Sequence, residues 1–331
     1  MREMTVTEVR SGVSLGVTLQ DLQSAFDHAP TGIVVLTPAG VVTGGNPALA
    51  LILGRELTEL VGNTLFPYTH PEDLPAARAN CAAIAAGSVT EVREDCRFLR
   101  TDGTAVWVRV STCRVAGRAD RAAHLIMHVE DISEHKALEA RLLHQALHDP
   151  LTEVGNRALL LQQVTADLTH PYPQPATLGD ECRDGELSVR VCGMVVLDVD
   201  GFKALNDAHG HPTGDAALIE VAHRVQAQLA PDDLVVRLGG DEFAVWCPVT
   251  TPDQLADLVT RLHEALDDPC QLGGAVMQVS ASIGSATTTF APGPPPGDRD
   301  NDAVIQVLAE LLRAADTAMF AVKHRLAAPP H

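Results

Sequence analysis

No apolar run in the 331-residue sequence approaches the roughly 20 residues that span a bilayer. The beginning of the chain, MREMTVTEVRSG, also lacks the apolar core of a secretory signal peptide. The seven cysteines are scattered and never form a CxxC pair, which indicates neither a disulfide framework nor a zinc ribbon. These absences predict a soluble cytoplasmic protein that does not insert into a membrane.

Basic residues are scarce as well. Lys and Arg together number 24 against 43 Asp and Glu, which gives a formal net charge of -19. A surface of this sign repels a nucleic-acid backbone, so we exclude nucleic acid as a partner. Any anionic ligand would need local Lys or Arg side chains, backbone amides or a metal ion.

The length and the 46% hydrophobic content allow two domains, each with its own core. The patterns of strands and helices predict an α/β chain of two domains joined by a helix. The expected parts are a flexible lead over 1–20, a sensory domain over 21–132, a linker helix over 133–148, a second domain over 149–326 and a tail over 327–331.

The first domain alternates short strands with short helices. Two β-branched runs surround a Pro/Gly turn in GIVVLTPAGVVTGGN, and the helical stretches PALALILGRELTELVG and 71–86 follow. Two more strands meet at Asp102 and Gly103, and HLIMHVEDI supplies a further one. The pattern predicts a mixed sheet flanked by short helices.

The linker, SEHKALEARLLHQALH, holds no Gly or Pro and is rich in strong helix formers. Asp131 and Glu134 have the spacing of a capping box at its start, and Pro150 marks its end. Ala140, Leu143 and Leu147 follow the spacing of a coiled-coil seam over barely two heptads.

In the second domain, strands and helices interleave. The apolar strand CGMVVLDV precedes a helix with one apolar face, and LVVRL and FAVWCPV flank a Gly-Gly turn. A further strand is expected in VMQVSASIG, and a proline-rich loop over 291–302 precedes the last helix. The apolar stripe of that helix is expected to contain Ile305, Leu308, Leu312, Ala315, Met319 and Val322.

Two acidic segments in this domain carry the chemistry. In VVLDVDGFKALNDAHGHPTGD, an apolar strand ends at Asp198 and Asp200, and a carboxylate at a strand end is a plausible ligand for a hard cation. In VVRLGGDEFAVW, Gly239 and Gly240 permit close backbone approach to a ligand, and Asp241 follows directly. Taken alone, the first segment also fits a solvated loop, and the second also fits a plain hairpin turn.

Five ordered segments decide between these alternatives. HDPLTEVGNR, the stretch from Asp198 to Asp215, RLGGDEF, SASIG and AADTAMFAVK resemble the motifs of GGDEF diguanylate cyclases over about residues 144–325. The resemblance implies a palm-like fold with helices around a central sheet. It also implies a nucleotidyltransferase that condenses two GTP into cyclic di-GMP and pyrophosphate as a homodimer, with cyclic di-GMP receptors downstream.

The resemblance also implies roles for individual residues. The metal, Mg²⁺ or Mn²⁺, would be held by Asp198, Val199 through its carbonyl, and Asp241. Catalysis would rest on Asp241, on Glu242 assisting deprotonation of the attacking 3′-hydroxyl, and on Lys203. Substrate contacts are expected from Phe202, Asn206, Asp215, Arg237, Gly239, Gly240 and Lys323, of which Asn206 and Asp215 would recognise guanine and Lys203 and Lys323 would neutralise phosphate charge.

The sequence departs from the family pattern at three places. The RxxD site that binds inhibitory product in many members reads Ala230, Pro231, Asp232, Asp233, so the arginine is missing and tight product inhibition there is not expected. Phe320 replaces a commoner Tyr, and EVG replaces a GLP-like segment of the first motif. Neither of these last two changes touches a proposed metal or base contact.

Residues from about 20 to 132 resemble a PAS domain, on GIVVLTPAG, Asn46, HPED, DGTAVWVRV and the closing VEDIS. The sequence does not indicate which ligand this domain binds. Asn80 and Cys81 lack the flanking residues of flavin-binding light sensors, so a packed cysteine is the better interpretation.

The histidines and the overall function also allow other interpretations. His70 and His128 are better explained as turn or core residues than as haem ligands. His144 and His148 stand four apart, and two ligands do not make a zinc site. The competing function is a catalytically silent GGDEF module that binds GTP or dimerises, whereas a pure PAS scaffold would ignore half of the chain.

Overall fold

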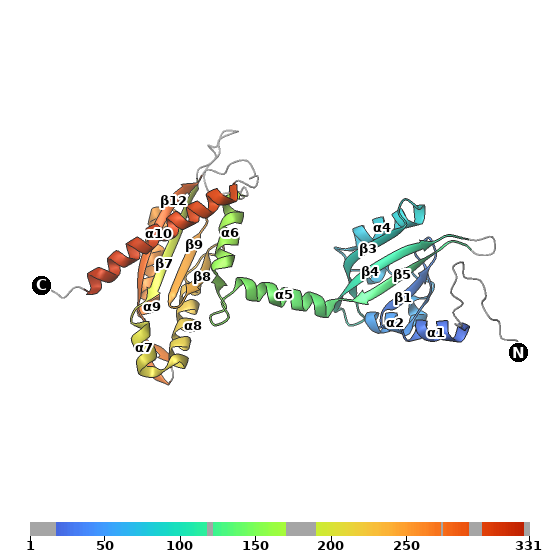
Figure 1. Cartoon of the computed structure of the whole chain (residues 1–331), viewed down its shortest axis with the longest axis horizontal. Coiled ribbons are helices and arrows are strands. Elements are labelled where there is room, and N and C mark those ends of the chain that lie inside the picture. Colours follow the sequence, from blue (N-terminus) through green and yellow to red (C-terminus); the bar gives the residue numbers. More distant parts are fainter. Residues whose placement is uncertain (1–17, 118–121, 170–189, 273, 291–299, 328–331) are drawn as a thin grey trace, which may run out of the picture. The chain divides into compact units, whose positions relative to one another are not determined.

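The computed structural model describes residues 18–117, 122–169, 190–272, 274–290 and 300–327. The chain divides into two compact units, Met1–Arg141 and Leu142–His331 (Figure 1). The expected lead, proline-rich loop and C-terminal tail lie mostly outside the described residues. No helix within the described ranges is long and apolar enough to cross a membrane.

The first unit is built on one five-stranded sheet in the order β2-β1-β5-β4-β3. Its elements are α1 (Leu19–Asp27), β1 (Gly32–Leu36), β2 (Val42–Gly45), α2 (Pro47–Leu53), α3 (Leu57–Leu60), the 3₁₀ helix η1 (Phe66–Tyr68), α4 (Leu74–Ala86), β3 (Glu91–Leu99), β4 (Ala105–Val115) and β5 (His124–Asp131). Every neighbouring pair of strands is antiparallel, whereas the sequence led us to expect a mixed sheet. The reason is that β3, β4 and β5 follow one another as hairpins, which need no parallel crossover.

Asn46 is fully buried, and its side chain makes four hydrogen bonds that hold together the first elements of this unit. Its Oδ1 accepts from the backbone amides of Leu49, at the start of α2, and of Ile33 in β1. Its Nδ2 donates to the carbonyls of Phe26 and Thr31. One side chain therefore caps a helix and ties it to the sheet, which explains an asparagine in an apolar core.

Helix α5 (Ser133–Leu147) begins against the edge of this sheet. Its start is held by Ser133, whose Oγ accepts from the Trp107 amide at 3.1 Å and whose own amide donates to Asp131 Oδ1 at 2.9 Å. Lys136 lies one turn further on and contacts the Asp95 carboxylate at 3.5 Å. A capping box of Asp131 and Glu134 would need a bond from the Glu134 amide to Asp131, whereas Asp131 accepts from the amide of Ser133. The Trp107 amide, a donor, ties Ser133 to β4.

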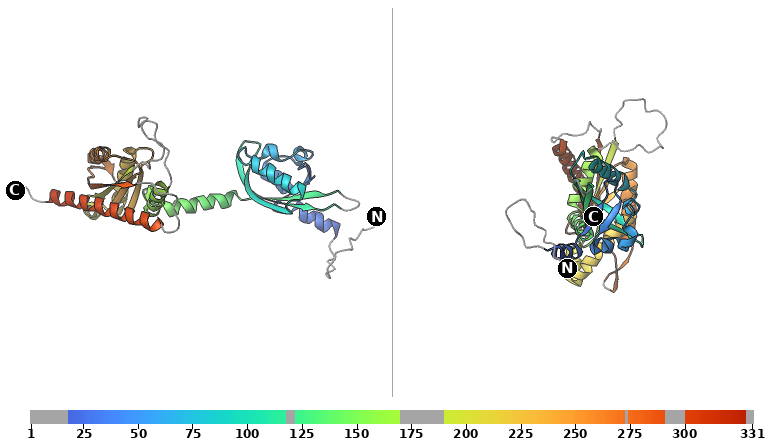
Figure 2. Two further views of the ribbon diagram at one scale, coloured as in Figure 1. Left: turned by 90° about the horizontal axis from the view of Figure 1, so that it is seen from above. Right: turned by 90° about the vertical axis from the view of Figure 1, so that its right-hand side faces the viewer.

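The second unit is a three-layer structure. Its elements are β6 (Gly155–Asn156), α6 (Arg157–Thr169), β7 (Arg190–Val199), α7 (Phe202–His209), α8 (His211–Ala227), β8 (Leu234–Gly239), β9 (Glu242–Cys247), α9 (Pro252–Asp267), β10 (Cys270–Leu272), β11 (Ala275–Met277), β12 (Ala281–Phe290) and α10 (Asp300–Ala327). The central sheet runs β12-β7-β9-β8-β6, and the short β6–β8 pair is parallel. The helices α6 and α10 lie on one face and α8 and α9 on the other (Figure 2).

Two expectations for this unit need correction. The stretch VMQVSASIG is divided between β11 and β12, which belong to different sheets. In α10, the buried stripe contains Val304, Leu308 and Leu311, followed by Ala315 and Met319, whereas Ile305 is 43% exposed. The helix packs across β12 and β7, and this packing decides which side chains are buried. In the first turns of α10, the buried positions are therefore one residue earlier than expected.

Candidate active site

Strand alternation directs Asp198 toward α10. Along β7, Cys192, Met194 and Val196 pack with α6 and α10, whereas Val195 and Leu197 pack with α8 and α9. Because side chains alternate along a strand, Asp198 continues the series that faces α10. Only 14% of the Asp198 side-chain surface is exposed, so the carboxylate lies at the edge of the core rather than in open solvent.

The acidic residues of the GGDEF segment lie beside it. Glu242 is the cross-strand partner of Asp198 in the β7–β9 pair, and the Val199 amide donates to the Asp241 carbonyl at 3.2 Å. Partial burial raises the pKa of Glu242, and the carboxylates of Asp198, Asp316 and Asp241 raise it further. Two segments more than forty residues apart in the chain thus form one acidic cluster.

One cation from α10 enters this cluster. Lys323 Nζ lies 2.5 Å from Asp198 Oδ1, and that hydrogen bond is the main reason that the pKa of Lys323 is raised. Helix α10 approaches the sheet closely at Gly284 of β12, where a Cβ would collide with the backbone of Ala315 and Met319. The glycine of SASIG therefore lets the helix lie where its lysine reaches the acidic cluster.

The Gly-Gly turn is supported by an ion pair. Gly239 and Gly240 have φ of 149° and 57°, a region that favours glycine. Arg237 donates to the Gly240 carbonyl from Nε at 3.0 Å and from Nη2 at 2.6 Å. Its Nη1 donates to Asp149 Oδ1 at 2.8 Å, so the first motif of the unit holds the turn through this arginine.

Asp149 is itself fixed by the loop that it begins. Its Oδ1 accepts from the amides of Leu151 and Thr152 and from the Thr152 hydroxyl. Burial raises the pKa of Asp149, but the hydrogen bonds from Arg237 and Thr152 outweigh burial, and the net shift is downward. The structure therefore shows Arg237 supporting the turn backbone, and its expected contact with substrate stays a prediction.

The second acid of the Asp-x-Asp pair has a structural partner on β12. Asp200 Oδ1 accepts from the Ser282 hydroxyl at 2.7 Å, Oδ2 accepts from Ser280 at 3.3 Å, and the Asp200 amide donates to the Ser280 carbonyl at 2.9 Å. These contacts close the loop between β7 and α7. Asp198, by contrast, contacts Lys323 of α10.

The residues expected to recognise guanine lie on α7 and α8. Asn206 Oδ1 is buried and has no hydrogen-bond donor among the described residues. It fills the space beside Gly214 of α8, where a Cβ would collide with it and would approach Phe202 to 3.2 Å. Lys203 and Asp215 are exposed, and Phe202 packs against the core. A buried acceptor without a donor is costly, so Asn206 is suited to receive an N–H from a ligand.

The acidic cluster fits a magnesium ion that is completed by its substrate. Within the part of the chain that the structure describes, no three His, Cys, Asp or Glu side chains form a metal-binding group. Magnesium is commonly held by one or two carboxylates, with phosphates and waters as its other ligands. This preference fits the expected ligands, which supply two carboxylates, from Asp198 and Asp241, and one further oxygen, the Val199 carbonyl.

The degenerate inhibitory segment forms a closed turn. The Ala230 amide donates to Asp233 Oδ2 at 3.0 Å, and the Asp233 amide donates to the Ala230 carbonyl at 3.1 Å. Asp233 is therefore occupied by its own turn. A cavity of about 260 Å³ beside it is also lined by Arg261 of α9, which donates to the Gln228 carbonyl.

Four further residues support the site, although they were not predicted as members of it. Asp149 hydrogen-bonds to Arg237, and Gly214 leaves room for Asn206. Ser282 is the cross-strand partner of Asp198 and hydrogen-bonds to Asp200, and Gly284 leaves room for α10. Each of them lies inside a segment that was recognised as a motif, HDPLT, GHPTGD or SASIG, but the sequence assigned no role to the individual residue.

Comparison with known proteins agrees with both units. The family model of the PAS fold matches residues 20–132, and the model described as "Diguanylate cyclase, GGDEF domain" matches residues 146–327. The chain is 36% identical over 182 residues to the bifunctional diguanylate cyclase/cyclic di-GMP phosphodiesterase MucR of Pseudomonas aeruginosa, which covers 55% of this chain and 23% of that protein. It is 32% identical over 188 residues to the diguanylate cyclase TpbB of the same species, covering 56% of this chain and 37% of that protein.

Among solved structures, the crystal structure of the diguanylate cyclase SiaD in complex with its activator SiaC, from Pseudomonas aeruginosa, superposes with a TM-score of 0.43 at 24% identity. The superposition covers 58% of this chain and 64% of that chain. The chain spans between 23% and 30% of the length of the first curated relatives that it matches.

Proposed function

The chain belongs to the GGDEF family of diguanylate cyclase domains, and from this we propose that its second unit condenses two GTP molecules into cyclic di-GMP with release of pyrophosphate. The observation that carries the proposal is the convergence of Asp198, Asp241 and Glu242 at one end of β7 and β9. The ammonium group of Lys323, from α10, contacts this acidic cluster at Asp198. This arrangement joins metal-binding carboxylates, a base and a phosphate-binding cation.

The bond changes follow the usual course of phosphoryl transfer. The 3′-hydroxyl oxygen of one GTP attacks the α-phosphorus of the other, a new phosphodiester bond forms, and the bond to the β-phosphate breaks as pyrophosphate leaves. Glu242 would accept the hydroxyl proton. Without a bound metal, burial and the neighbouring carboxylates raise the pKa of Glu242, which favours this residue as the proton acceptor. A second step of the same kind, between the remaining 3′-hydroxyl and the remaining α-phosphorus, releases the second pyrophosphate and closes the ring.

A magnesium ion held by Asp198, Val199 and Asp241 would offset the charge of the phosphates. The residues of this chain do the positioning. Lys323 and Lys203 would bind phosphate oxygens, Asn206 and Asp215 would bind the guanine edge, and the Gly239–Gly240 turn would lie against the nucleotide. Arg237 and Asp149 would keep that turn in place, because both hydrogen-bond to it or to each other.

The second unit of each chain offers one nucleotide site, and the product contains two nucleotides, so we propose that catalysis occurs in a homodimer. The PAS unit would regulate this assembly through α5. The pairing of Lys136 with Asp95 and of Ser133 with Trp107 supports this, because the first turn of α5 is bonded to strands of the PAS sheet. Cyclic di-GMP receptors would then be the downstream partners.

The test is incubation of the purified full chain with GTP and Mg²⁺, followed by chromatography of the nucleotides. We expect cyclic di-GMP from the wild-type protein and none from Asp241→Ala, with Asp253→Ala, an exposed acid on α9, as a matched control that keeps full activity.

A silent GTP-binding module is the second candidate, because the Asp198 carboxylate is already paired with Lys323 in this structure. Binding of GTP at normal affinity without turnover would favour that candidate over the enzyme.

A further inference from the structure

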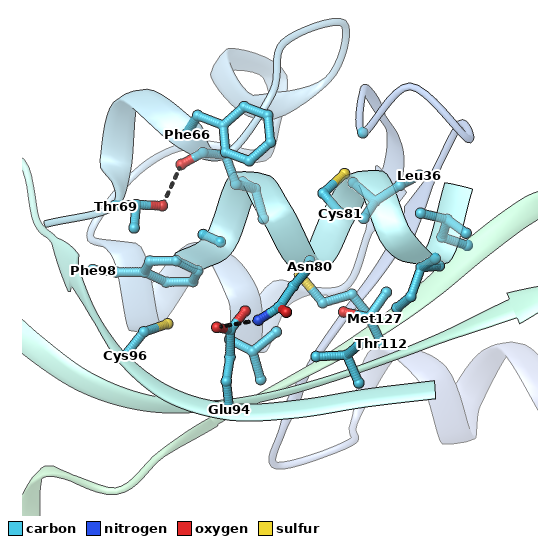
Figure 3. Close-up of a pocket in the computed structure, with 17 residues that line it drawn as sticks. Leu36, Phe66, Thr69, Asn80, Cys81, Glu94, Cys96, Phe98, Thr112 and Met127 are labelled. Carbon is cyan, nitrogen blue, oxygen red and sulfur yellow. Dashed lines mark hydrogen bonds between the residues drawn. The ribbon is translucent and has the colours of Figure 1, made fainter. Parts of the chain in front are cut away.

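A partly open cavity of about 50 Å³ lies in the first unit, between α4 and the inner face of the sheet (Figure 3). A cavity needs roughly 10–15 Å³ of this volume to hold one water molecule, so this one has room for a ligand of on the order of four non-hydrogen atoms. It lies outside the GGDEF unit, and the inference drawn from it is independent of the function proposed above.

The walls of this cavity are mostly apolar, with Leu36, Ile84 and Phe98 among them. Its lining includes no Lys, Arg or His side chain, and neither His70 nor His128 reaches it. The charged group in the lining is Glu94 of β3, which strand alternation places on the inner side with Cys96 and Phe98.

Glu94 is hydrogen-bonded to Asn80 at the cavity. Asn80 Nδ2 of α4 donates to Glu94 Oε2 at 2.7 Å, and Figure 3 shows the two side chains pointing toward each other from opposite walls. Burial raises the pKa of Glu94, and the nearby negative charge of Asp73 raises it further despite the Asn80 bond. An acid in an apolar cavity without a cation lacks a counter-charge, and a bound cation would supply one.

The two cysteines of the cavity do not favour covalent chemistry. Burial raises the pKa of Cys81, and burial with neighbouring acids raises the pKa of Cys96 to about 12. Both thiols therefore stay protonated near neutral pH, and a thiolate is the nucleophilic form. A ligand in this cavity would be held by packing and by polar contacts to the Asn80–Glu94 pair.

We propose that this cavity binds a small primary amine in its ammonium form, with the ammonium group against the Glu94 carboxylate and the short hydrocarbon chain among the apolar walls. Three N–H donors of an ammonium suit the oxygens of Glu94 together with Oδ1 of Asn80. An anion of the same size meets the negative charge of Glu94, and an alcohol leaves that charge uncompensated.

The test is isothermal titration calorimetry of the full chain at pH 7.5 with three probes of nearly equal size: n-propylammonium chloride, n-propanol and sodium propionate. Four non-hydrogen atoms limit the Kd to roughly 4 × 10⁻⁵ M at the tightest. We expect one n-propylammonium per chain, bound at least about tenfold more tightly than n-propanol, and no detectable binding of propionate.

Glu94→Gln keeps the size of the side chain and the bond from Asn80 but removes the charge. We expect it to weaken n-propylammonium binding at least about tenfold and to leave n-propanol unchanged. Glu91→Gln, which removes the same charge from an exposed position on the same strand, should bind like wild type. Equal affinity for amine and alcohol, stronger binding of propionate, no binding of any probe, or full amine affinity in a folded Glu94→Gln protein would each overturn the proposal.

Discussion

Lys323 Nζ and Asp198 Oδ1 are 2.5 Å apart, although 125 residues separate them in the chain. The contact joins α10 to the end of β7, and it neutralises one carboxylate of a cluster that also contains Asp241, Glu242 and Asp316. It brings an ammonium group to the place where the proposed reaction puts phosphate charge.

Lys323→Met keeps the length of the side chain and removes the ammonium group. We expect a loss of about 10²-fold in kcat/KM for GTP, because one donor to developing phosphate charge disappears. Arg313→Met, an exposed cation on the same helix, is the matched control and should keep the wild-type rate. Steady-state rates and far-ultraviolet circular dichroism would be measured together. A folded Lys323→Met protein with a rate within twofold of wild type would contradict the assignment.

Asp149→Asn tests the ion pair beneath the Gly-Gly turn. Both partners are mostly buried, with 19% and 13% of their side-chain surface exposed, so the change should lower the free energy of unfolding by about 1–3 kcal/mol at pH 7. Activity should fall as well, since Arg237 also holds the Gly240 carbonyl.

The pH dependence of that difference follows from the sign of the shift. The folded-state pKa of Asp149 is below its ordinary value, so its contribution is present above the unfolded pKa of about 3.9 and is lost as the pH falls below it. Urea unfolding of both proteins between pH 7 and pH 3 would measure this. The difference in unfolding free energy should be constant down to about pH 5 and should then shrink; a difference that grew on acidification would be inconsistent with the ion pair.

Gly214→Ala tests how guanine is recognised. The added Cβ collides with Asn206 Oδ1, the end of a flexible side chain, so Asn206 should turn away while the fold persists. We expect KM for GTP to rise about tenfold, kcat to change little, and the preference for GTP over inosine triphosphate to shrink, because a hydrogen bond to the base is lost.

Gly44→Ala is the matched control for that variant, since no atom lies within 4 Å of its added Cβ. Unchanged discrimination between the two nucleotides in Gly214→Ala would show that Asn206 does not read the base.

Insertions in α5 after Ala140 test whether helix phase transmits the PAS state. Four added residues rotate one end by roughly 40° at about 100° per residue, whereas seven nearly restore the heptad. The four-residue insertion should alter cyclic di-GMP synthesis strongly, and the seven-residue insertion should resemble wild type. Size-exclusion chromatography would confirm that both variants dimerise. Equal rates in the two would favour control by dimerisation alone.

Local patterns predicted most elements of the fold. The apolar face of α8, the strands around the Gly-Gly turn and the uninterrupted helix α5 lie where periodicity and helix formers indicated them. The antiparallel pairing of the PAS sheet was not predicted, because side-chain alternation fixes a strand but not the direction of its neighbour. The buried stripe of α10 was shifted because its crossing over β12 and β7, rather than its own sequence, selects the face.

In the candidate site as well, local patterns predicted some residues, whereas contacts between distant residues were not predictable. Asp198, Asp241 and Glu242 stand in segments that carry their own signal, a strand end and a glycine turn. The contacts of Lys323 with Asp198 and of Arg237 with Asp149 join residues far apart in the chain, and no local pattern encodes such pairs. Gly214 and Gly284 act through the space that they leave to Asn206 and α10, and such space is visible only once the elements are packed.

The most direct test of the proposed activity is to measure both products of the full chain with GTP and Mg²⁺, cyclic di-GMP by mass spectrometry and pyrophosphate by a coupled assay. We predict two pyrophosphates for each cyclic di-GMP, with neither formed by the folded Asp241→Ala protein. Release of inorganic phosphate instead of pyrophosphate, unchanged GTP after prolonged incubation, or equal product from Asp241→Ala would contradict the account.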